Sequence, residues 1–245
     1  MIPKIQPENL DKPRKEKVNI QKAVIFDSGA LISLAMSNLL GELKKLKEKF
    51  NGKFLITADV KRETIDKPLT IKRFWLQAMM IEQLLLDKVL EMSDAVDIPE
   101  EAINTQTKKL MDVANSMFES KGRSVKLISS GESSCLALSK LLREKGVENV
   151  IAVDERTTRI LAEKPGNLKE IMERKLHSKI KMKNENFAEF KDFKFVRSTE
   201  LMYVAYKKGL IKIRKEKVLD AVLWALKSHG CSISYDEIKE IVSLK

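Results

Sequence analysis

The sequence predicts an α/β protein with a parallel central sheet flanked by helices. Continuous apolar runs at residues 22–26, 53–57 and 148–153 are typical of short strands that are covered on both faces. Between these runs, apolar residues recur every three or four positions, as they do along one face of a helix. Strands that alternate with helices favour a parallel sheet, because each helix carries the chain back to the same edge.

The first half of the chain supplies two of these strands. Apolar residues from Ile32 to Phe50 have helical spacing and predict one long helix, which Asn51-Gly52 would end. The run KFLIT, residues 53–57, then predicts the second strand. A further helix is expected around Val60, is interrupted at Pro68, and continues through the apolar run FWLQAMMIEQLLL.

The second half continues the alternation. Pro99 is expected to open a helix that reaches about Ser120. The next helix, Gly131 to Lys145, is followed by Gly146, a typical stop. The sequence ENVIAVDER then predicts the third strand, and RTTRILAEK a helix that Pro165-Gly166 would break.

The ends of the chain differ in character from its middle. Residues 1–21 contain prolines and a basic cluster, and predict an N-terminal arm. Residues 22–196 are expected to form the main domain, although 172–196 are polar and basic with a weak strand signal at FKFV. Residues 197–245 predict two or three helices packed on that domain, with a capping box at Ser234-x-x-Glu237.

Charge indicates the kind of partner. The chain has 46 Lys and Arg against 35 Asp and Glu, so its formal net charge is +11. This excess favours an anionic partner, with nucleic acid ahead of a membrane surface. Heat-adapted proteins also carry surfaces rich in Lys and Glu, which is an alternative explanation.

Neither cysteine chemistry nor a membrane is expected. Cys135 and Cys231 are too far apart for a zinc motif and are expected to be small core residues. No run approaches the roughly 20 apolar residues of a membrane span. The N-terminal residues have no apolar segment of the kind that signal peptides contain. These features predict a soluble, cytoplasmic protein.

Four acidic residues are placed where they would converge at one edge of the sheet. Asp27 and Asp154 each follow an apolar strand, at the end where parallel sheets bind ligands. Glu63 and Glu132 lie in the first turns of helices, on the sides expected to face inward. Each could instead serve its helix alone, as an N-cap or as a charge that complements the helix dipole. Together, converging carboxylates would repel one another unless a hard divalent cation bound among them.

In their order, these segments resemble the PIN-domain ribonuclease superfamily. The resemblance rests on AVIFDSGALI at residues 23–32, on Val60–Glu63, on GESSCLAL from Gly131, and on AVDERTTR at residues 152–159. It covers about residues 22–165. The tail, LMYVAYKKGLIK followed by VLDAVLWALKSHGCSISYDEIKEIV, looks like the C-terminal helices of a prokaryotic, VapC-like subfamily.

The resemblance implies a three-layer α/β/α fold with extra helices and an acidic pocket. It implies that Asp27, Glu132 and Asp154 bind Mg²⁺ or Mn²⁺, and that Glu63 completes the catalytic ring. The auxiliary residues that it implies are Ser28 in support of Asp27, Glu155 as a further ligand, and Arg159 as a brace for the acids. One departure is the length between Glu63 and Glu132, which leaves room for an extra helical layer.

The function that follows is a metal-dependent endoribonuclease that hydrolyses RNA phosphodiester bonds. A negative pocket repels RNA, so basic surroundings would have to draw the backbone in. Candidates for this role occur in three clusters: Lys12, Arg14, Lys15 and Lys17; Arg174, Lys175, Lys179, Lys181 and Lys183; and Lys207, Lys208, Lys212, Arg214 and Lys215. Each cluster could equally be a solvated face.

Two roles and one rival function remain open. The enzyme could act in RNA processing or decay, or as a toxin that a small antitoxin protein inhibits. Another candidate partner is a second copy of the chain, which would form a homodimer. The rival is a non-catalytic RNA-binding or scaffold module, in which the acids are remnants or helix caps. A response of the folded protein to Mn²⁺ would separate the two.

Overall fold

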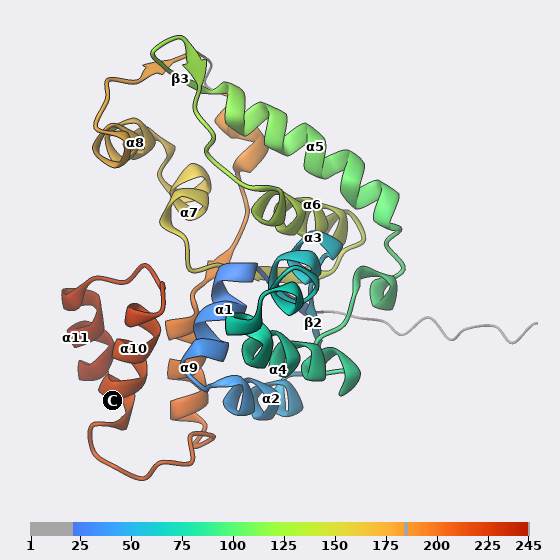
Figure 1. The fold of residues 1–245 in the computed structure, drawn as a ribbon, viewed down its shortest axis with the longest axis vertical. Coiled ribbons are helices and arrows are strands. Elements are labelled where there is room, and N and C mark those ends of the chain that lie inside the picture. Colours follow the sequence, from blue (N-terminus) through green and yellow to red (C-terminus); the bar gives the residue numbers. More distant parts are fainter. Residues whose placement is uncertain (1–21, 184–185, 245) are drawn as a thin grey trace, which may run out of the picture.

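A parallel sheet lies at the centre of the computed structural model, which describes residues 22–183 and 186–244 (Figure 1). The strand order is β2–β1–β5–β7, and every neighbouring pair is parallel. The strands are β1 (Lys22–Phe26), β2 (Lys53–Leu55), β5 (Glu148–Ala152) and β7 (Phe195–Val196). Helices flank this sheet, so the predicted α/β class with a parallel sheet is confirmed.

The register of the two inner strands brings their carboxyl ends together. Phe26, the last residue of β1, is level with Ala152, the last residue of β5. The backbone N–H of Asp27 donates to the carbonyl of Ala152 at 2.9 Å, which extends this pairing beyond the strands. Ile25 and Phe26 are fully buried, as strands covered on both faces require. The residues that follow β1 and β5 therefore leave the sheet side by side.

The helix predicted from Ile32 to Phe50 is wrong, because the chain breaks it into two. These are α1 (Ser28–Met36) and α2 (Leu40–Lys49). Between them Asn38 takes a left-handed backbone conformation, with φ of 56°, which asparagine tolerates better than most residues. Apolar spacing continued across the break, because both helices bury residues against the same core.

After β2 the chain forms a series of short helical turns before a longer helix. These elements are α3 (Ala58–Lys61), the π-helical turn η1 (Arg62–Asp66), the 3₁₀ turns η2 (Pro68–Thr70) and η3 (Lys72–Phe74), α4 (Trp75–Leu86) and the 3₁₀ turn η4 (Ser93–Val96). The predicted interruption at Pro68 is confirmed. Glu63 lies in η1, and π turns of this kind occur often at functional sites.

Two long helices then pack against each other. They are α5 (Glu100–Ser116) and α6 (Ser130–Glu144). The prediction that the helix after Pro99 reaches Ser120 is wrong at its end, because Phe118–Ser120 forms strand β3. It belongs to a small antiparallel sheet, with β4 (Arg123–Ser124) and β6 (Lys181–Met182) as its neighbours. Gly146 ends the region of α6 with a positive φ of 76°, as expected for a glycine stop.

The last part of the chain is mainly helical. Its elements are α7 (Arg156–Glu163), η5 (Pro165–Asn167), α8 (Leu168–Leu176), η6 (Phe187–Phe190), α9 (Ser198–Lys207), α10 (Val218–Ser228) and α11 (Tyr235–Ser243). The capping box of Ser234 and Glu237 at the start of α11 is confirmed.

The C-terminal helices belong to the same hydrophobic core as the sheet. Leu201 and Met202 of α9 and Leu223 of α10 are buried in one cluster with the strands. Helix α9 packs against both α1 and α2. Among residues 22–183 and 186–244, no helix is both long enough and apolar enough to cross a bilayer. The predicted arm, residues 1–21, lies outside the described residues, together with its candidates Lys12, Arg14, Lys15 and Lys17.

Candidate active site at the carboxyl edge of the sheet

Asp27 occupies the centre of the predicted site. It ends β1 and is the N-cap of α1, where its Oδ2 accepts a hydrogen bond from the backbone N–H of Gly29 at 3.1 Å. The side chain is buried, with 3% of the residue exposed. Its second oxygen, Oδ1, is buried and has no hydrogen-bond partner among the described residues. A carboxylate with one unsatisfied, desolvated oxygen is costly, and it is suited to a cation or a proton.

Glu63 is held near Asp27 by Ser28, the residue that follows Asp27 and begins α1. The hydroxyl of Ser28 donates to Oε2 of Glu63 at 2.8 Å. Glu63 also lies against the backbone of α6, because a Cβ placed on Gly131 would be only 2.6 Å from that same oxygen. The glycine at this position therefore makes room for the carboxylate. Ser28 thus supports Asp27 through its backbone, which lowers the pKa of that carboxyl group, whereas its hydroxyl contacts Glu63.

Glu132 reaches the site from the first turn of α6. It forms a capping box, in which its Oε2 accepts from the backbone N–H of Ser129 at 2.7 Å. Its Oε1 accepts from the hydroxyl of Thr158 on α7. The helix-capping role weighed for this residue is thus real, and the same carboxylate also links α6 to α7.

The charges of Glu132 and Glu63 act on Asp27. Burial, and then the negative charge of Glu132, raise the pKa of Asp27 to about 7, and Glu63 contributes in the same direction. Backbone hydrogen bonds from Gly29 and Ser28 oppose this rise. A carboxylate with such a pKa is protonated about half of the time at neutral pH unless a cation binds.

Cys135 lies directly beneath these acids. Its Sγ is 3.6 Å from the carbonyl oxygen of Phe26, and the residue is buried, as predicted for a core cysteine. Burial raises the pKa of its thiol well above the usual value, and the charges of Asp27, Glu132 and Glu63 raise it further. The thiol therefore stays neutral and acts as the apolar floor of the site.

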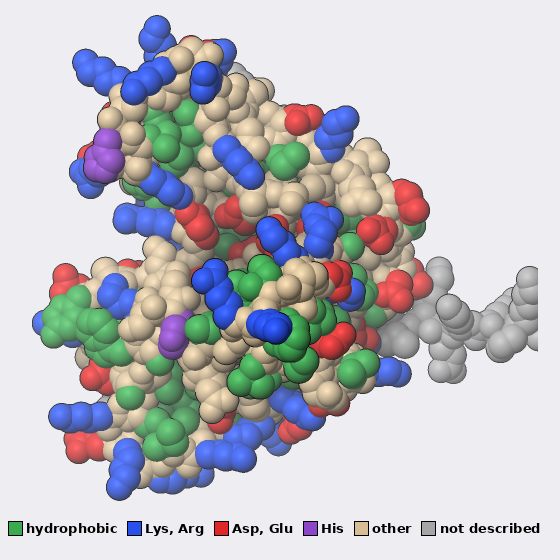
Figure 2. Space-filling model, viewed as in Figure 1, with side chains coloured by type: hydrophobic (Ala, Val, Ile, Leu, Met, Phe, Trp, Pro, Cys, Tyr) green, Lys and Arg blue, Asp and Glu red, His purple; other side chains and the backbone are tan. Residues whose placement is uncertain are grey.

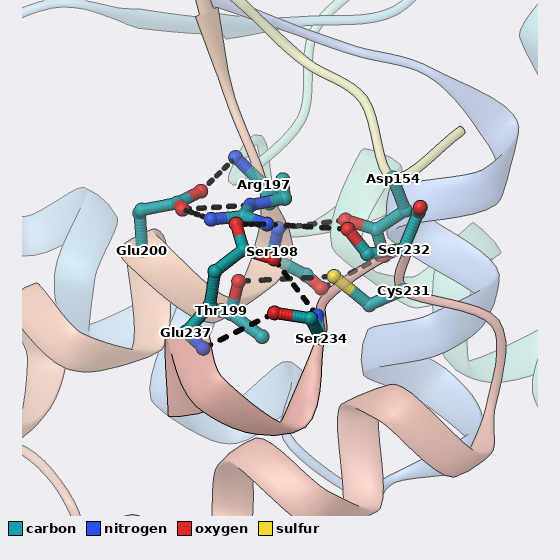
Figure 3. A network of polar contacts seen from close by, with 9 residues as sticks. All are labelled: Asp154, Arg197, Ser198, Thr199, Glu200, Cys231, Ser232, Ser234 and Glu237. Atoms are coloured by element: carbon teal, nitrogen blue, oxygen red, sulfur yellow. Dashed lines mark hydrogen bonds and ion pairs between the residues drawn. The ribbon is translucent and has the colours of Figure 1, made fainter. Parts of the chain in front are cut away.

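Asp154 follows β5, the strand that pairs with β1, but its side chain binds Ser198 of α9. Its Oδ1 accepts from the backbone N–H of Ser198 at 2.8 Å, and its Oδ2 from the hydroxyl of Ser198 at 2.7 Å (Figure 3). Asp154 thereby anchors the first turn of α9 and is 1% exposed. Both oxygens retain lone pairs, since each accepts one hydrogen bond. Its part in metal binding stays a prediction.

A charged network continues from Asp154 towards the C-terminal helices. Arg197, 8% exposed, lies within 2.7 Å of Oε1 of Glu237 and also pairs with Glu200 (Figure 3). Burial alone would raise the pKa of Glu237, but hydrogen bonds from Ser234 and Arg197 lower it to about 2. This network fixes α9 and α11 to the edge of the sheet that carries Asp154.

The other two auxiliary residues do not contact the acids as expected. Glu155 is the N-cap of α7: it accepts from the backbone N–H groups of Thr157 and Thr158 and lies 3.2 Å from the Nζ of Lys175. Arg159 has no hydrogen bond to any of the four acids within the described part of the chain, and its buried Nε has no partner there. Glu155 caps its own helix, and Arg159 instead lines a cavity between α7 and the α10–α11 connection.

The four acids are the right type of ligand for a hard cation, but their side chains do not form a complete coordination site in the described residues. Carboxylate oxygens are the ligands that Mg²⁺ and Mn²⁺ prefer. The unpartnered Oδ1 of Asp27, with Glu63 and Glu132 beside it, is the natural place for such an ion. In residues 22–183 and 186–244, no three His, Cys, Asp or Glu side chains are close enough to bind one ion as they stand.

The described basic candidates lie at opposite ends of the molecule. Arg174, Lys175, Lys179, Lys181 and Lys183 belong to the α8–β6 region, and Lys207, Lys208, Lys212, Arg214 and Lys215 to α9 and the loop before α10 (Figure 1). All are exposed. Some are paired: Arg174 with Glu170, and Lys183 with Glu119. The two clusters do not converge on the acids.

One groove borders the acid cluster, and a second cavity adjoins that groove. The groove, of about 670 Å³, begins at Glu63 and is lined mainly by apolar residues of α1 and α4, such as Met36 and Ile81. It reaches Gly230 after α10, which also borders the second cavity, lined by Arg156 and Arg159. The acids thus lie beside hollowed surface.

Sequence reasoning missed the residues that orient the acids. Ser198, Thr158 and Gly131 contact Asp154, Glu132 and Glu63 respectively. Ser198 is 44 positions from Asp154, and Thr158 is 26 from Glu132, so neither contact leaves a local signal. Gly131 was noted as a helix start and as part of the segment GESSCLAL, but its contact with Glu63 was not predicted.

Comparison with family models, with curated proteins and with solved structures gave no match.

Proposed function

We propose that this chain is a divalent-metal-dependent endoribonuclease that hydrolyses RNA phosphodiester bonds, in RNA processing or decay or as a toxin. One observation carries the proposal: Asp27 has a buried, unpartnered carboxylate oxygen with Glu132 and Glu63 as charged neighbours. A structural N-cap needs only one oxygen, and Oδ2 already serves that purpose. The second oxygen and the surrounding negative charge support a bound cation at this position.

The residues of the chain divide the work between them. Asp27, Glu63 and Glu132 would hold Mg²⁺ or Mn²⁺, and Asp154 would join if its bonds to Ser198 gave way. When bound, the ion lowers the pKa of a water molecule and stabilises charge on the phosphate under attack. Ser28 and Gly131 set the position of Glu63, and Thr158 sets that of Glu132. The net charge of +11 offsets the repulsion between this acidic site and RNA.

Cleavage of a mixed-sequence RNA tests the proposal. We expect fragments with Mn²⁺ and none with chelator, and we expect Asp27→Asn to abolish cleavage. Asp112→Asn is the matched control, because Asp112 is an exposed acid of α5. Fragments from Asp27→Asn at the wild-type rate would contradict the proposal and indicate a contaminating nuclease. Asp154→Asn, measured alongside, shows whether Asp154 takes part in the reaction.

A second candidate function is a non-catalytic RNA-binding or scaffold module. The observation that favours it is that Glu132, Asp154 and Glu155 all have satisfied roles within the fold, at the starts of α6, α9 and α7. Such a module would bind RNA without cleaving it. It would also show no rise in melting temperature with Mn²⁺, because only a ligand that binds the folded state stabilises it.

A further inference from the structure

We propose that the cavity between α7 and the α10–α11 connection binds backbone phosphates of single-stranded RNA, as a subsite next to the acid cluster. The cavity has a volume of about 620 Å³. Its basic lining consists of Arg156 and Arg159 from α7 and Lys227 from α10. This inference rests on the proposed function, because a ribonuclease would need to hold a strand here.

The surface view shows that this cavity is open to solvent. Figure 2 shows the molecule hollowed between the region of α7 and α8 and the region of α10 and α11. Arg156 and Arg159 are three positions apart on α7, so they lie on the same face of that helix. A polyanion could reach both guanidinium groups from solvent.

The cations of the cavity have no counter-charge of their own. Within the described residues, neither Arg156 nor Arg159 forms an ion pair, and the buried Nε of Arg159 lacks any hydrogen-bond partner. The cavity's one acidic lining residue is Glu237, and its charge is already paired with Arg197 at 2.7 Å. A buried guanidinium nitrogen without an acceptor is costly. Arg159 as a whole is only half-buried, so an anion bound at its accessible donors would offset part of that cost.

Lys227 contributes charge from the opposite wall. Its Nζ donates to the carbonyl of Ile233, which fixes the ammonium at the cavity while leaving further donors free. A guanidinium presents a planar pair of donors that matches the geometry of a phosphate, and two of them with an ammonium favour phosphodiester groups over a single carboxylate.

The cavity is linked to two of the acids, one through α7 and the other through the α10–α11 connection. Thr158, the neighbour of Arg159 in sequence, donates to Glu132. Ser232 lines the cavity while its backbone N–H donates to the carbonyl of Asp154 at 3.0 Å. Gly230 borders both this cavity and the groove that begins at Glu63. An RNA strand that crosses the acid cluster would therefore place a neighbouring phosphate within reach of Arg159.

Binding measured in chelator separates this proposal from catalysis. The probe is a fluorescent 12-nucleotide RNA of mixed sequence, and the readout is its dissociation constant over a series of salt concentrations. We expect the double variant Arg156→Gln/Arg159→Gln to bind about tenfold more weakly. We also expect its salt dependence to fall, since each phosphate contact to a single strand contributes roughly 0.7 to the logarithmic slope.

The matched control removes two positive charges elsewhere. Lys49 at the end of α2 and Arg123 of β4 are exposed and lie outside the cavity, so Lys49→Gln/Arg123→Gln should leave both affinity and slope nearly unchanged. If the α7 double variant melts early, Arg156→Gln and Lys227→Gln are measured singly, with an expected loss of a few fold each.

Three results would overturn the subsite. They are an unchanged affinity in the α7 variants, an equal loss in the control, and no binding of the RNA by the wild-type protein. Whether the protein is a nuclease is decided by a separate measurement, Mn²⁺-dependent RNA cleavage. RNA binding that depends on Arg156 and Arg159, without any Mn²⁺-dependent cleavage, would keep the subsite and reject the proposed activity.

Discussion

Asp27 combines two properties that oppose each other: its side chain is buried, and Glu132 and Glu63 place further negative charge beside it. Burial alone disfavours the ionised form, and like charge adds to that cost. Hydrogen bonds from Gly29 and Ser28 recover only part of it, so the pKa remains raised to about 7. The folded protein without a cation is therefore under electrostatic stress at this one residue.

The first prediction follows from that stress. Because the pKa of Asp27 rises from 3.8 to about 7 on folding, the folded state holds a proton that the unfolded state releases. Its contribution to the free energy of unfolding is therefore present below about pH 4 and declines as the pH rises to about 7. Asp27→Asn should lack this decline and, in chelator at pH 8, be more stable than the wild type by up to roughly 4 kcal/mol.

Urea denaturation of both proteins at several pH values measures this difference. Added Mn²⁺ should narrow it, because an ion that binds the folded wild type stabilises only that protein. Parallel stability curves for the wild type and Asp27→Asn between pH 4 and pH 8 would contradict the prediction.

The second prediction concerns the space that Gly131 leaves for Glu63. In Gly131→Ala the new Cβ would lie 2.6 Å from Oε2 of Glu63, so that flexible carboxylate must move. Stability should change by less than about 1 kcal/mol, since alanine is favoured in helices. The displaced carboxylate should lower RNA cleavage by on the order of 100-fold. Gly41→Ala, in α2 with open space around it, is the control and should retain full activity. Equal activity of the two variants would remove Glu63 from the site.

For individual residues, the sequence could predict which acids lie at the edge of the sheet but not the directions of their side chains. Positions after apolar strands indicated Asp27 and Asp154, because strand ends are readable from local pattern. That Asp154 turns to Ser198, and that Arg159 faces a cavity, depends on helices distant in sequence. Side-chain direction at a sheet edge is set by tertiary packing, which leaves no periodic signal.

Among the elements, α9 and α11 owe their positions to one buried arginine. Arg197 precedes α9 and binds Glu200 in its first turn, while its other donors reach Ser232 and Glu237 before and within α11. Removal of this buried cation would leave the carboxylates of Glu200 and Glu237 without their positive counter-charge. The network thus couples two helices that local propensity would leave independent.

The third prediction tests that coupling through Glu237. Its pKa is lowered to about 2 in the folded protein, below the ordinary value of 4.5, so its stabilising effect exists above pH 4.5 and is lost as the pH falls through about 2. The Glu237 side chain is 43% exposed, so solvent screens the pair strongly. We expect Glu237→Gln to lose at most about 1 kcal/mol at pH 7.

Chemical denaturation at pH 7 and near pH 3 checks this, with a smaller difference expected at the lower pH. Glu240→Gln provides the comparison, because Glu240 is exposed on the same helix. A loss in Glu237→Gln that stays constant with pH, or that Glu240→Gln reproduces, would show that the ion pair does not stabilise α11.

Elements were predictable where their own residues determine them. The start of α11 and the end of α6 follow from a capping box and a glycine. Helix α8 was missed because its exposed residues are polar and basic, so its second half was taken as part of the polar segment 172–196. Its buried face is small and includes Leu168 and Met172. The break at Asn38 was missed because both α1 and α2 face one core, which keeps the apolar spacing continuous across it.

For the molecule as a whole, the boundary drawn at residue 197 marks a change in sequence pattern but not a separate core. Leu223 of α10 is fully buried in the cluster that also contains Leu34 of α1 and Phe26 of β1. Asp154 and Ser198 join the two parts by paired hydrogen bonds at the sheet edge. Contacts that cross a boundary so densely favour unfolding as one unit.

The last prediction uses the chain's two tryptophans, which lie on either side of that boundary, Trp75 on α4 and Trp224 on α10. Both are about 40% exposed, so Trp75→Phe and Trp224→Phe should fold and each leave one fluorescent reporter. The urea transitions of the two variants should coincide. Adding Leu223→Ala should lower the free energy of unfolding by about 2–5 kcal/mol in both signals, because the cavity it creates lies in a shared core. A shift of the Trp224 signal alone would mean that residues 197–245 unfold independently, and that the acid cluster does not depend on them.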